Sequence, residues 1–113
     1  MDPRIEQYFR DQKMEGELDS SRREKYFIHT KQLIIYILSR AVNSRSVAQM
    51  MGCSLDTVYK SIKIIKKKIV AEDDLNKSRP TLLLITRVTA ALTYNYDLPW
   101  IDNKDIIPLL LRK

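Results

Sequence analysis

The chain has few of the residues that turn-rich folds, disulfides and metal sites require. Only two of its 113 residues are glycine, which disfavours a fold built of many strands and turns. Cys53 is the single cysteine, so no disulfide can form within the chain, and we expect a reducing, cytoplasmic setting in a prokaryote or its plasmids and viruses. The single histidine, His29, has no cysteines or carboxylates at ligand spacing, so we expect no metal.

Signals for membrane proteins and enzymes are also missing. No apolar run approaches the ~20 residues that a membrane-spanning helix needs, and the first residues are acidic and polar rather than those of a signal peptide. The chain has no glycine-rich phosphate loop and no convincing nucleophile–base set. We therefore expect no enzymatic activity, no cofactor and no small-molecule ligand, which leaves binding and interaction functions.

The net charge of +6 is distributed unevenly along the chain. Residues 1–20 carry a net charge of −3, residues 21–78 carry +7 and residues 79–113 carry +2. A surface that only needs to be solvated does not require such segregation. The basic middle of the chain is the pattern of a protein that binds a polyanion.

Two helices joined by a glycine-containing turn are predicted between Ser44 and Lys68. Asn43 should cap the first helix, whose apolar residues follow one helical stripe and stop before Gly52. That stripe consists of Val47, Ala48 and Met51. Glycine is favoured where a chain leaves a helix in the left-handed conformation. Ser54 then offers a side-chain oxygen to the N-terminus of the second helix.

The second helix, predicted from Leu55 to Val70, has an apolar face and a basic face. The apolar residues recur at spacings of three and four, at Leu55, Val58, Ile62, Ile65 and Ile69. If the N-terminal half of this helix enters the major groove of DNA, its polar side chains meet bases and phosphates. The expected base-facing residues are Thr57, Lys60, Ser61 and Tyr59. Expected phosphate contacts are Arg45, Lys63, Lys66 and Lys67, and Ser54 and Asp56 complete the candidate DNA-binding set.

The combination of Ala48, Gly52, Ser54, Thr57 and Val58 resembles the helix-turn-helix of LuxR-type regulators and of the sigma-factor domain that reads the −35 promoter element. The resemblance covers residues 31–70, roughly a third of the chain. It implies a mainly α, tri- or tetrahelical helix-turn-helix that binds double-stranded DNA sequence-specifically. A small transcriptional regulator is the function it favours.

The residues before this unit are predicted to form two helices. Residues 1–19 form a short acidic helix that starts with Asp2 and Pro3 and either docks on a partner subunit or frays. Residues 20–72 form the DNA-binding domain, whose long scaffold helix opens with a capping box at Ser21. The expected inner face of that scaffold helix consists of Phe27, Thr30, Leu33, Ile34, Ile35, Ile37, Leu38 and Ala41.

The segment from Pro80 to Tyr96 fits two structures. Its apolar spacing, with Ser78 as N-cap, favours a helical extension, whereas its threonines and tyrosines favour strands. In the second case the protein is a winged helix-turn-helix, in which residues 69–73 and 81–85 pair as a hairpin.

The last residues are apolar for a chain end. A short helix is predicted from Ile106 to Leu111, after a turn-rich break that contains Trp100. Residues 79–113 either complete the core or form a dimer contact. We expect a homodimer, because most small helix-turn-helix proteins bind two half-sites.

Two other functions fit the same module. One is DNA binding in plasmid partition, at a replication origin or in viral packaging. The other is protein–protein contact, for which the acidic N-terminus and the apolar C-terminus are suited. Only a DNA contact shows a steep dependence of affinity on salt concentration. A salt titration therefore separates protein–protein contact from both DNA-binding functions.

Overall fold

The computed structural model of the protein describes residues 1–15, 20–74, 79–98 and 101. These residues form five helices and no strand: α1 (Pro3–Glu15), α2 (Ser20–Ser39), α3 (Ser44–Met51), α4 (Leu55–Asp74) and α5 (Pro80–Asn95). The prediction of a mainly α fold is therefore confirmed for the described part of the chain. The wing hairpin was wrong, because its two segments lie within α4 and α5.

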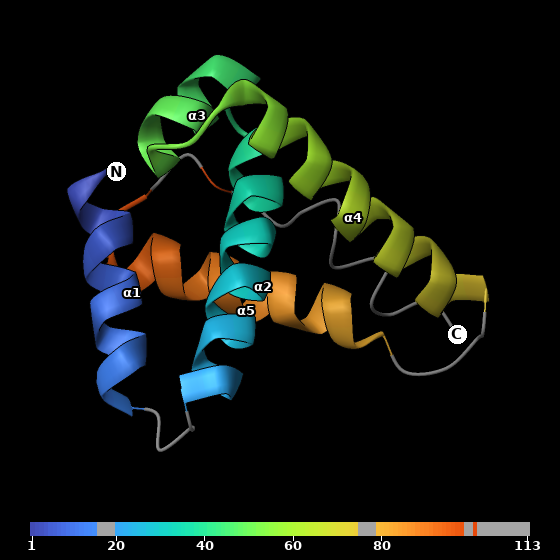
Figure 1. Cartoon of the computed structure of the whole chain (residues 1–113), viewed down its shortest axis with the longest axis horizontal. Coiled ribbons are helices and arrows are strands. Elements are labelled where there is room, and N and C mark those ends of the chain that lie inside the picture. Colours follow the sequence, from blue (N-terminus) through green and yellow to red (C-terminus); the bar gives the residue numbers. More distant parts are fainter. Residues whose placement is uncertain (16–19, 75–78, 99–100, 102–113) are drawn as a thin grey trace.

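α2 is the central helix of the fold and contacts α3, α4 and α5 (Figure 1). Its inner face was predicted largely correctly, because Leu33, Ile34, Ile37 and Leu38 are at most 2% exposed. Ala41 is the exception. It lies beyond the last residue of α2 and is exposed, since the helix ends two residues before Ala41.

α1 packs into the same core as the other helices. Ile5, Tyr8 and Phe9 are buried, and the ring of Phe9 lies 4.7 Å from that of Phe27 in α2. Asp2 caps the helix as predicted, since its Oδ1 accepts a hydrogen bond from the backbone N–H of Arg4 at 2.9 Å. The apolar stripe of α1 that was expected to meet a partner or fray is thus buried within this chain.

α5 passes behind α2 in Figure 1 and closes the core from that side. The helix predicted for this segment is confirmed, and its buried residues are Thr81, Leu82, Ile85, Val88, Thr89 and Leu92. Arg79 rather than Ser78 occupies the N-cap position, with Pro80 in the first turn. Ser78 itself lies outside the described residues.

The chain after α5 also contributes to the core. Leu98 is fully buried and Ile101 is 5% exposed. Trp100, the predicted helix from Ile106 to Leu111 and the side chain of Ser21 lie outside the described residues. None of the described helices combines the length and the apolarity that crossing a membrane requires.

Candidate nucleic-acid interface

The turn between α3 and α4 has the capping geometry that its sequence predicts. Asn43 caps α3, because its Oδ1 accepts a hydrogen bond from the backbone N–H of Ser46 at 2.9 Å. Gly52 ends α3 with φ 63° and ψ 39°, the left-handed conformation that glycine adopts without strain. The backbone N–H of Cys53 then donates to the carbonyl of Ala48 at 3.0 Å and closes the helix end.

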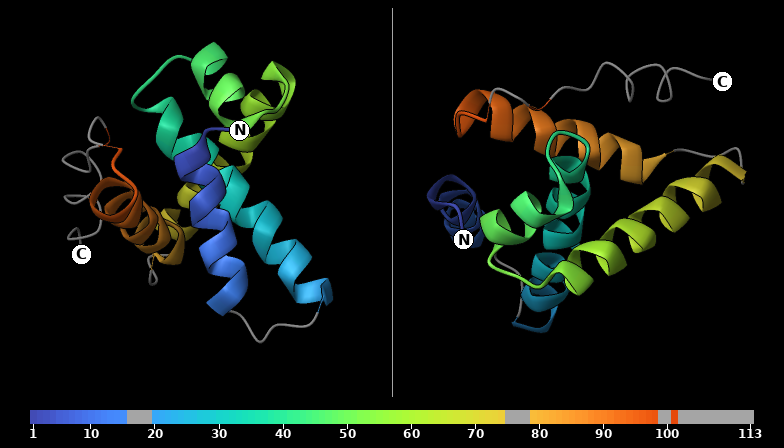
Figure 2. Two further views of the ribbon diagram at one scale, coloured as in Figure 1. Left: turned by 90° about the vertical axis from the view of Figure 1, so that its left-hand side faces the viewer. Right: turned by 90° about the horizontal axis from the view of Figure 1, so that it is seen from above.

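The first two residues of the chain pack against this turn. The backbone N–H of Asp2 donates to the carbonyl oxygen of Met50 at 2.6 Å, which ties the start of α1 to the end of α3. A Cβ added to Gly52 would lie 3.2 Å from the backbone nitrogen of Met1. Both views in Figure 2 place the start of α1 close to α3. The sequence pattern contained no signal for this contact, which joins residues about 50 positions apart.

α4 begins with the predicted serine cap. Ser54 Oγ accepts a hydrogen bond from the backbone N–H of Thr57 at 3.1 Å and lies 2.9 Å from the hydroxyl of the same residue. The helix extends to Asp74, four residues beyond the predicted end at Val70. It is therefore about 30 Å long, and its C-terminal half extends well beyond α3 (Figure 1).

The buried face of α4 differs from the prediction at two positions. Val58 and Ile65 are fully buried as expected. Ser61, predicted to face bases, is only 5% exposed and is excluded from the interface, because it lies one turn from Val58 and Ile65 on the inner side. Leu55, predicted to be buried, is 36% exposed, because it is the first residue of the helix and lies at its open end.

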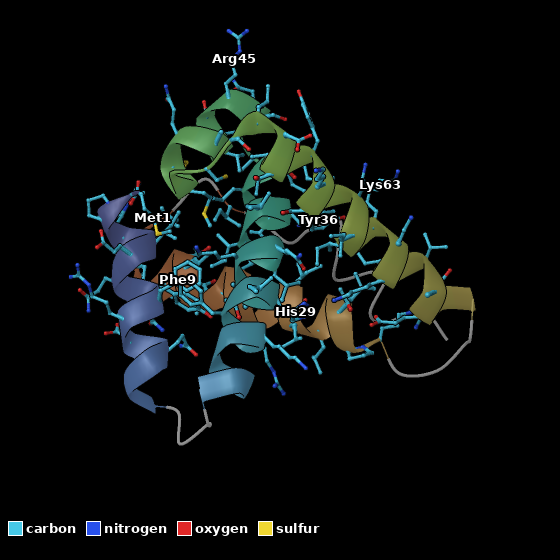
Figure 3. The ribbon with its side chains drawn as sticks, in the orientation of Figure 1. Met1, Phe9, His29, Tyr36, Arg45 and Lys63 are labelled. Carbon is cyan, nitrogen blue, oxygen red and sulfur yellow. The ribbon has the colours of Figure 1, made fainter. Side chains whose placement is uncertain are left out.

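The other predicted DNA-binding residues are all exposed. They are Arg45 at the start of α3, Ser54 in the turn, and Asp56, Thr57, Tyr59, Lys60, Lys63, Lys66 and Lys67 on α4. Arg45 and Lys63 project outward from α3 and α4 in Figure 3. Lys60 pairs with Asp56 at 3.0 Å, but both side chains are more than 70% exposed, so this pair is weak and opens readily toward another anion.

One flank of this face carries a groove that the sequence analysis missed. Its volume is about 550 Å³, and its lining combines apolar side chains with lysines: Tyr59, Ile62, Lys63, Lys66, Lys67, Val70 and Ala71. Tyr59 and Val70 are 56% and 58% exposed. The signal was available, because these residues recur at spacings of three and four within the predicted helix apart from Ala71, but the lysines and Tyr59 were assigned to DNA and Ile62 to the core.

Cys53 packs in the turn as predicted. Burial raises the pKa of its thiol, and the positive charge of Lys31 opposes this shift only in part. A raised pKa leaves little thiolate near neutral pH, which fits a packing residue rather than a reactive one. In the part of the chain that the structure describes, no three histidine, cysteine or carboxylate side chains gather where they could hold a metal ion.

Comparisons of the chain with protein-family models, with curated proteins and with solved structures find no match.

Proposed function

We propose that the protein binds double-stranded DNA sequence-specifically through α3 and α4 and acts as a small transcriptional regulator. α4 is the recognition helix, and the residues of its N-terminal half meet the edges of the bases. The observation that carries the proposal is the combination of two capped helices, a left-handed glycine between them and a row of exposed lysines on the second helix.

The side chains divide into two sets by their position. Thr57, Tyr59 and Lys60 lie in the first turns of α4, where a helix docked by its N-terminal half meets bases. Phosphate contacts come from Arg45, Lys63, Lys66 and Lys67. Such contacts hold the helix in register but carry no sequence information, so the first set determines specificity.

The protein is further proposed to act as a homodimer, so that two copies of α4 read two half-sites. A single recognition helix of this size contacts few base pairs. A second copy doubles both the base contacts and the phosphate contacts.

Protein contact is the second candidate function, and the groove on α4 favours it. An exposed tyrosine and an exposed valine next to three lysines form a surface that an acidic amphipathic helix would fit. The same lysines cannot pair with phosphates and with an acidic partner at once, so the two functions compete for one surface.

Selection of binding sites from a random DNA library, followed by titration at several salt concentrations, tests the proposal. Four phosphate contacts per protomer predict that log K falls with log salt at a slope of about −3.6 per protomer. A selection that enriches no sequence, with a slope near zero, would reject DNA binding and favour the protein-contact alternative. An enriched sequence with this slope supports the regulator.

A further inference from the structure

A second basic surface lies between α2 and α4, apart from the proposed DNA interface. It is a hollow of about 340 Å³ whose lining comes from both helices: Lys25, Ile28, His29 and Gln32 on α2, and Lys68 on α4. The four residues of α2 follow at spacings that place them on one face of the helix. Among the side chains that the structure describes, no carboxylate lines the hollow, and none of the lining residues belongs to the candidate DNA-binding set.

His29 lines this hollow and hydrogen-bonds with Lys68 across it. Lys68 Nζ lies 3.1 Å from His29 Nδ1. An ammonium group can only donate, so Nδ1 accepts, and the proton of the neutral ring is on Nε2. Burial and the charge of Lys68 lower the pKa of His29 below its ordinary value of 6.5, and the charge of Glu72 opposes this only in part. The ring is therefore neutral at pH 7 and offers one N–H.

Glu72, the carboxylate whose charge acts on His29, has another partner. Glu72 lies one turn beyond Lys68 on α4, and its two oxygens accept hydrogen bonds from the backbone N–H of Thr81 at 3.3 and 3.0 Å. Its Oε1 also accepts from the hydroxyl of Thr81 at 2.6 Å. Glu72 is thus engaged at the start of α5, and the described lining of the hollow offers its two lysines no carboxylate.

We propose that this hollow binds a phosphate group through Lys25, Lys68 and the ring N–H of His29. A phosphate dianion matches the two ammonium charges, and its oxygens accept from the ammonium groups, the imidazole N–H and the amide of Gln32. Ile28, which is 51% exposed, provides an apolar contact for the organic part of a phosphate ester.

Two sources can supply that phosphate: the backbone of bound DNA, or a free phosphate-bearing ligand. Figure 3 places His29 on α2 below α4, whereas Arg45 lies at the top of the molecule. Binding of a free phosphate-bearing ligand does not depend on the proposed DNA function. Binding of a DNA backbone phosphate does depend on it.

NMR of the imidazole ring tests the proposal, because His29 is the only histidine and its signals need no assignment by mutation. The full-length protein is titrated with inorganic phosphate, and with sodium chloride at matched ionic strength. The ring signals are expected to shift saturably with phosphate alone, with a dissociation constant of ~1 mM or tighter. Bound phosphate should also raise the pKa of His29, because an anion favours the imidazolium form.

Charge-removing variants show whether these residues hold the anion. Lys25→Gln combined with Lys68→Gln should weaken phosphate binding by at least ~10-fold, because the two positive charges that attract the anion are lost. Arg10→Gln combined with Arg87→Gln removes the same charge on α1 and α5 and should bind phosphate as the wild type does. The four lysine and arginine side chains are exposed, so the variants remain folded. Equal binding by the double lysine variant, or equal shifts with phosphate and chloride, would overturn the proposal.

A titration of the protein with its selected DNA then identifies the source. If DNA shifts the ring signals and phosphate has no further effect, the phosphate belongs to the DNA backbone. If the complex still binds phosphate, the ligand is free. A protein that binds phosphate but no DNA would reject the proposed function and leave the phosphate site standing. Failure of the proposed function is therefore distinguishable from failure of the phosphate site.

Discussion

At the scale of single residues, the turn between α3 and α4 shows how two constraints meet at one position. Gly52 has a positive φ, which other residues rarely adopt, and its missing side chain leaves room for the backbone of Met1. The sequence predicted the first constraint, because a glycine follows an apolar helical stripe. The second constraint exists only because α1 folds back onto the turn.

Replacing Gly52 by valine should lower the free energy of unfolding by more than ~1 kcal/mol, because a β-branched residue resists the left-handed conformation and its Cβ would crowd Met1. Urea denaturation measures the difference. Gly52→Asn is the informative companion, since asparagine tolerates positive φ and should be less harmful. A valine variant as stable as the wild type would contradict the geometry of this turn.

Reversing the charges of Lys60 and Lys63 to Glu should weaken DNA binding by ~10-fold or more, because both lie on the outward face of α4. A mobility-shift titration at fixed salt measures the effect. Arg10→Glu combined with Arg87→Glu changes the net charge equally on α1 and α5 and should have a much smaller effect. Ser61→Ala should leave affinity unchanged, since that side chain is buried.

Asp2 links stability to pH. The hydrogen bond from the side chain of Arg4 lowers the pKa of Asp2 below its ordinary value of 3.8, although burial opposes this. A depressed pKa stabilises the folded state above the unfolded value, and that stability is lost as the pH falls through the folded pKa. Asp2→Asn keeps a capping side chain but removes the charge. The variant should therefore be less stable than the wild type at neutral pH and equal to it in strong acid, as measured by urea denaturation. A difference that stays constant with pH would exclude this linkage.

At the scale of elements, α4 combines three roles: it is the proposed recognition helix, it packs against the core through Val58 and Ile65, and its Glu72 caps the next helix. Val58 and Ile65 pack against the interior, while Lys60 and Lys63 project outward. At its C-terminal end, Glu72 holds the start of α5. This arrangement explains why α5 begins where it does without a capping side chain at Arg79.

Glu72→Ala should lower the free energy of unfolding by ~1–2 kcal/mol, because it removes a cap and leaves the buried hydroxyl of Thr81 without its carboxylate partner. Thermal and urea denaturation report the change. Glu6→Ala is the control, because Glu6 forms only an exposed ion pair with Arg10 and should change stability little. Equal stability of the Glu72 variant and the wild type would show that α5 does not depend on this cap.

At the scale of the whole molecule, the described helices form a single core to which all five contribute. Leu98 and Ile101 extend that core beyond α5. A truncation that removes residues 97–113 therefore takes away core side chains as well as any dimer contact. Cutting after Ile101 separates the two effects.

The intact protein should be a dimer at ~100 μM in light scattering, with two copies on each DNA site. Truncation after Ile101 should yield a folded monomer if residues 102–113 form the dimer contact, since the described core remains complete. Circular dichroism checks that the truncated chain is folded. An intact chain that is monomeric and binds DNA as one copy per site would rule out the dimer.

Sequence alone determined the helical class, the turn at Gly52, the caps at Asp2, Asn43 and Ser54, and most of the exposed face of α4. These features depend on interactions between residues a few positions apart, such as the bond from Ser54 to Thr57, which local spacing encodes. The periodicity of α2 was predicted for the same reason.

Only the tertiary structure decided between helix and strand for residues 80–96, and between buried and exposed positions for polar residues such as Ser61. α5 is a helix because Glu72 caps it and the core covers Leu82 and Ile85, although its threonines also suit strands. Ser61 is polar and was assigned to the outer face, yet α4 lies against the core on that side and buries it. α1 docks on the turn at Gly52 and Lys68 meets His29 because distant segments fold together, and no local pattern records such contacts.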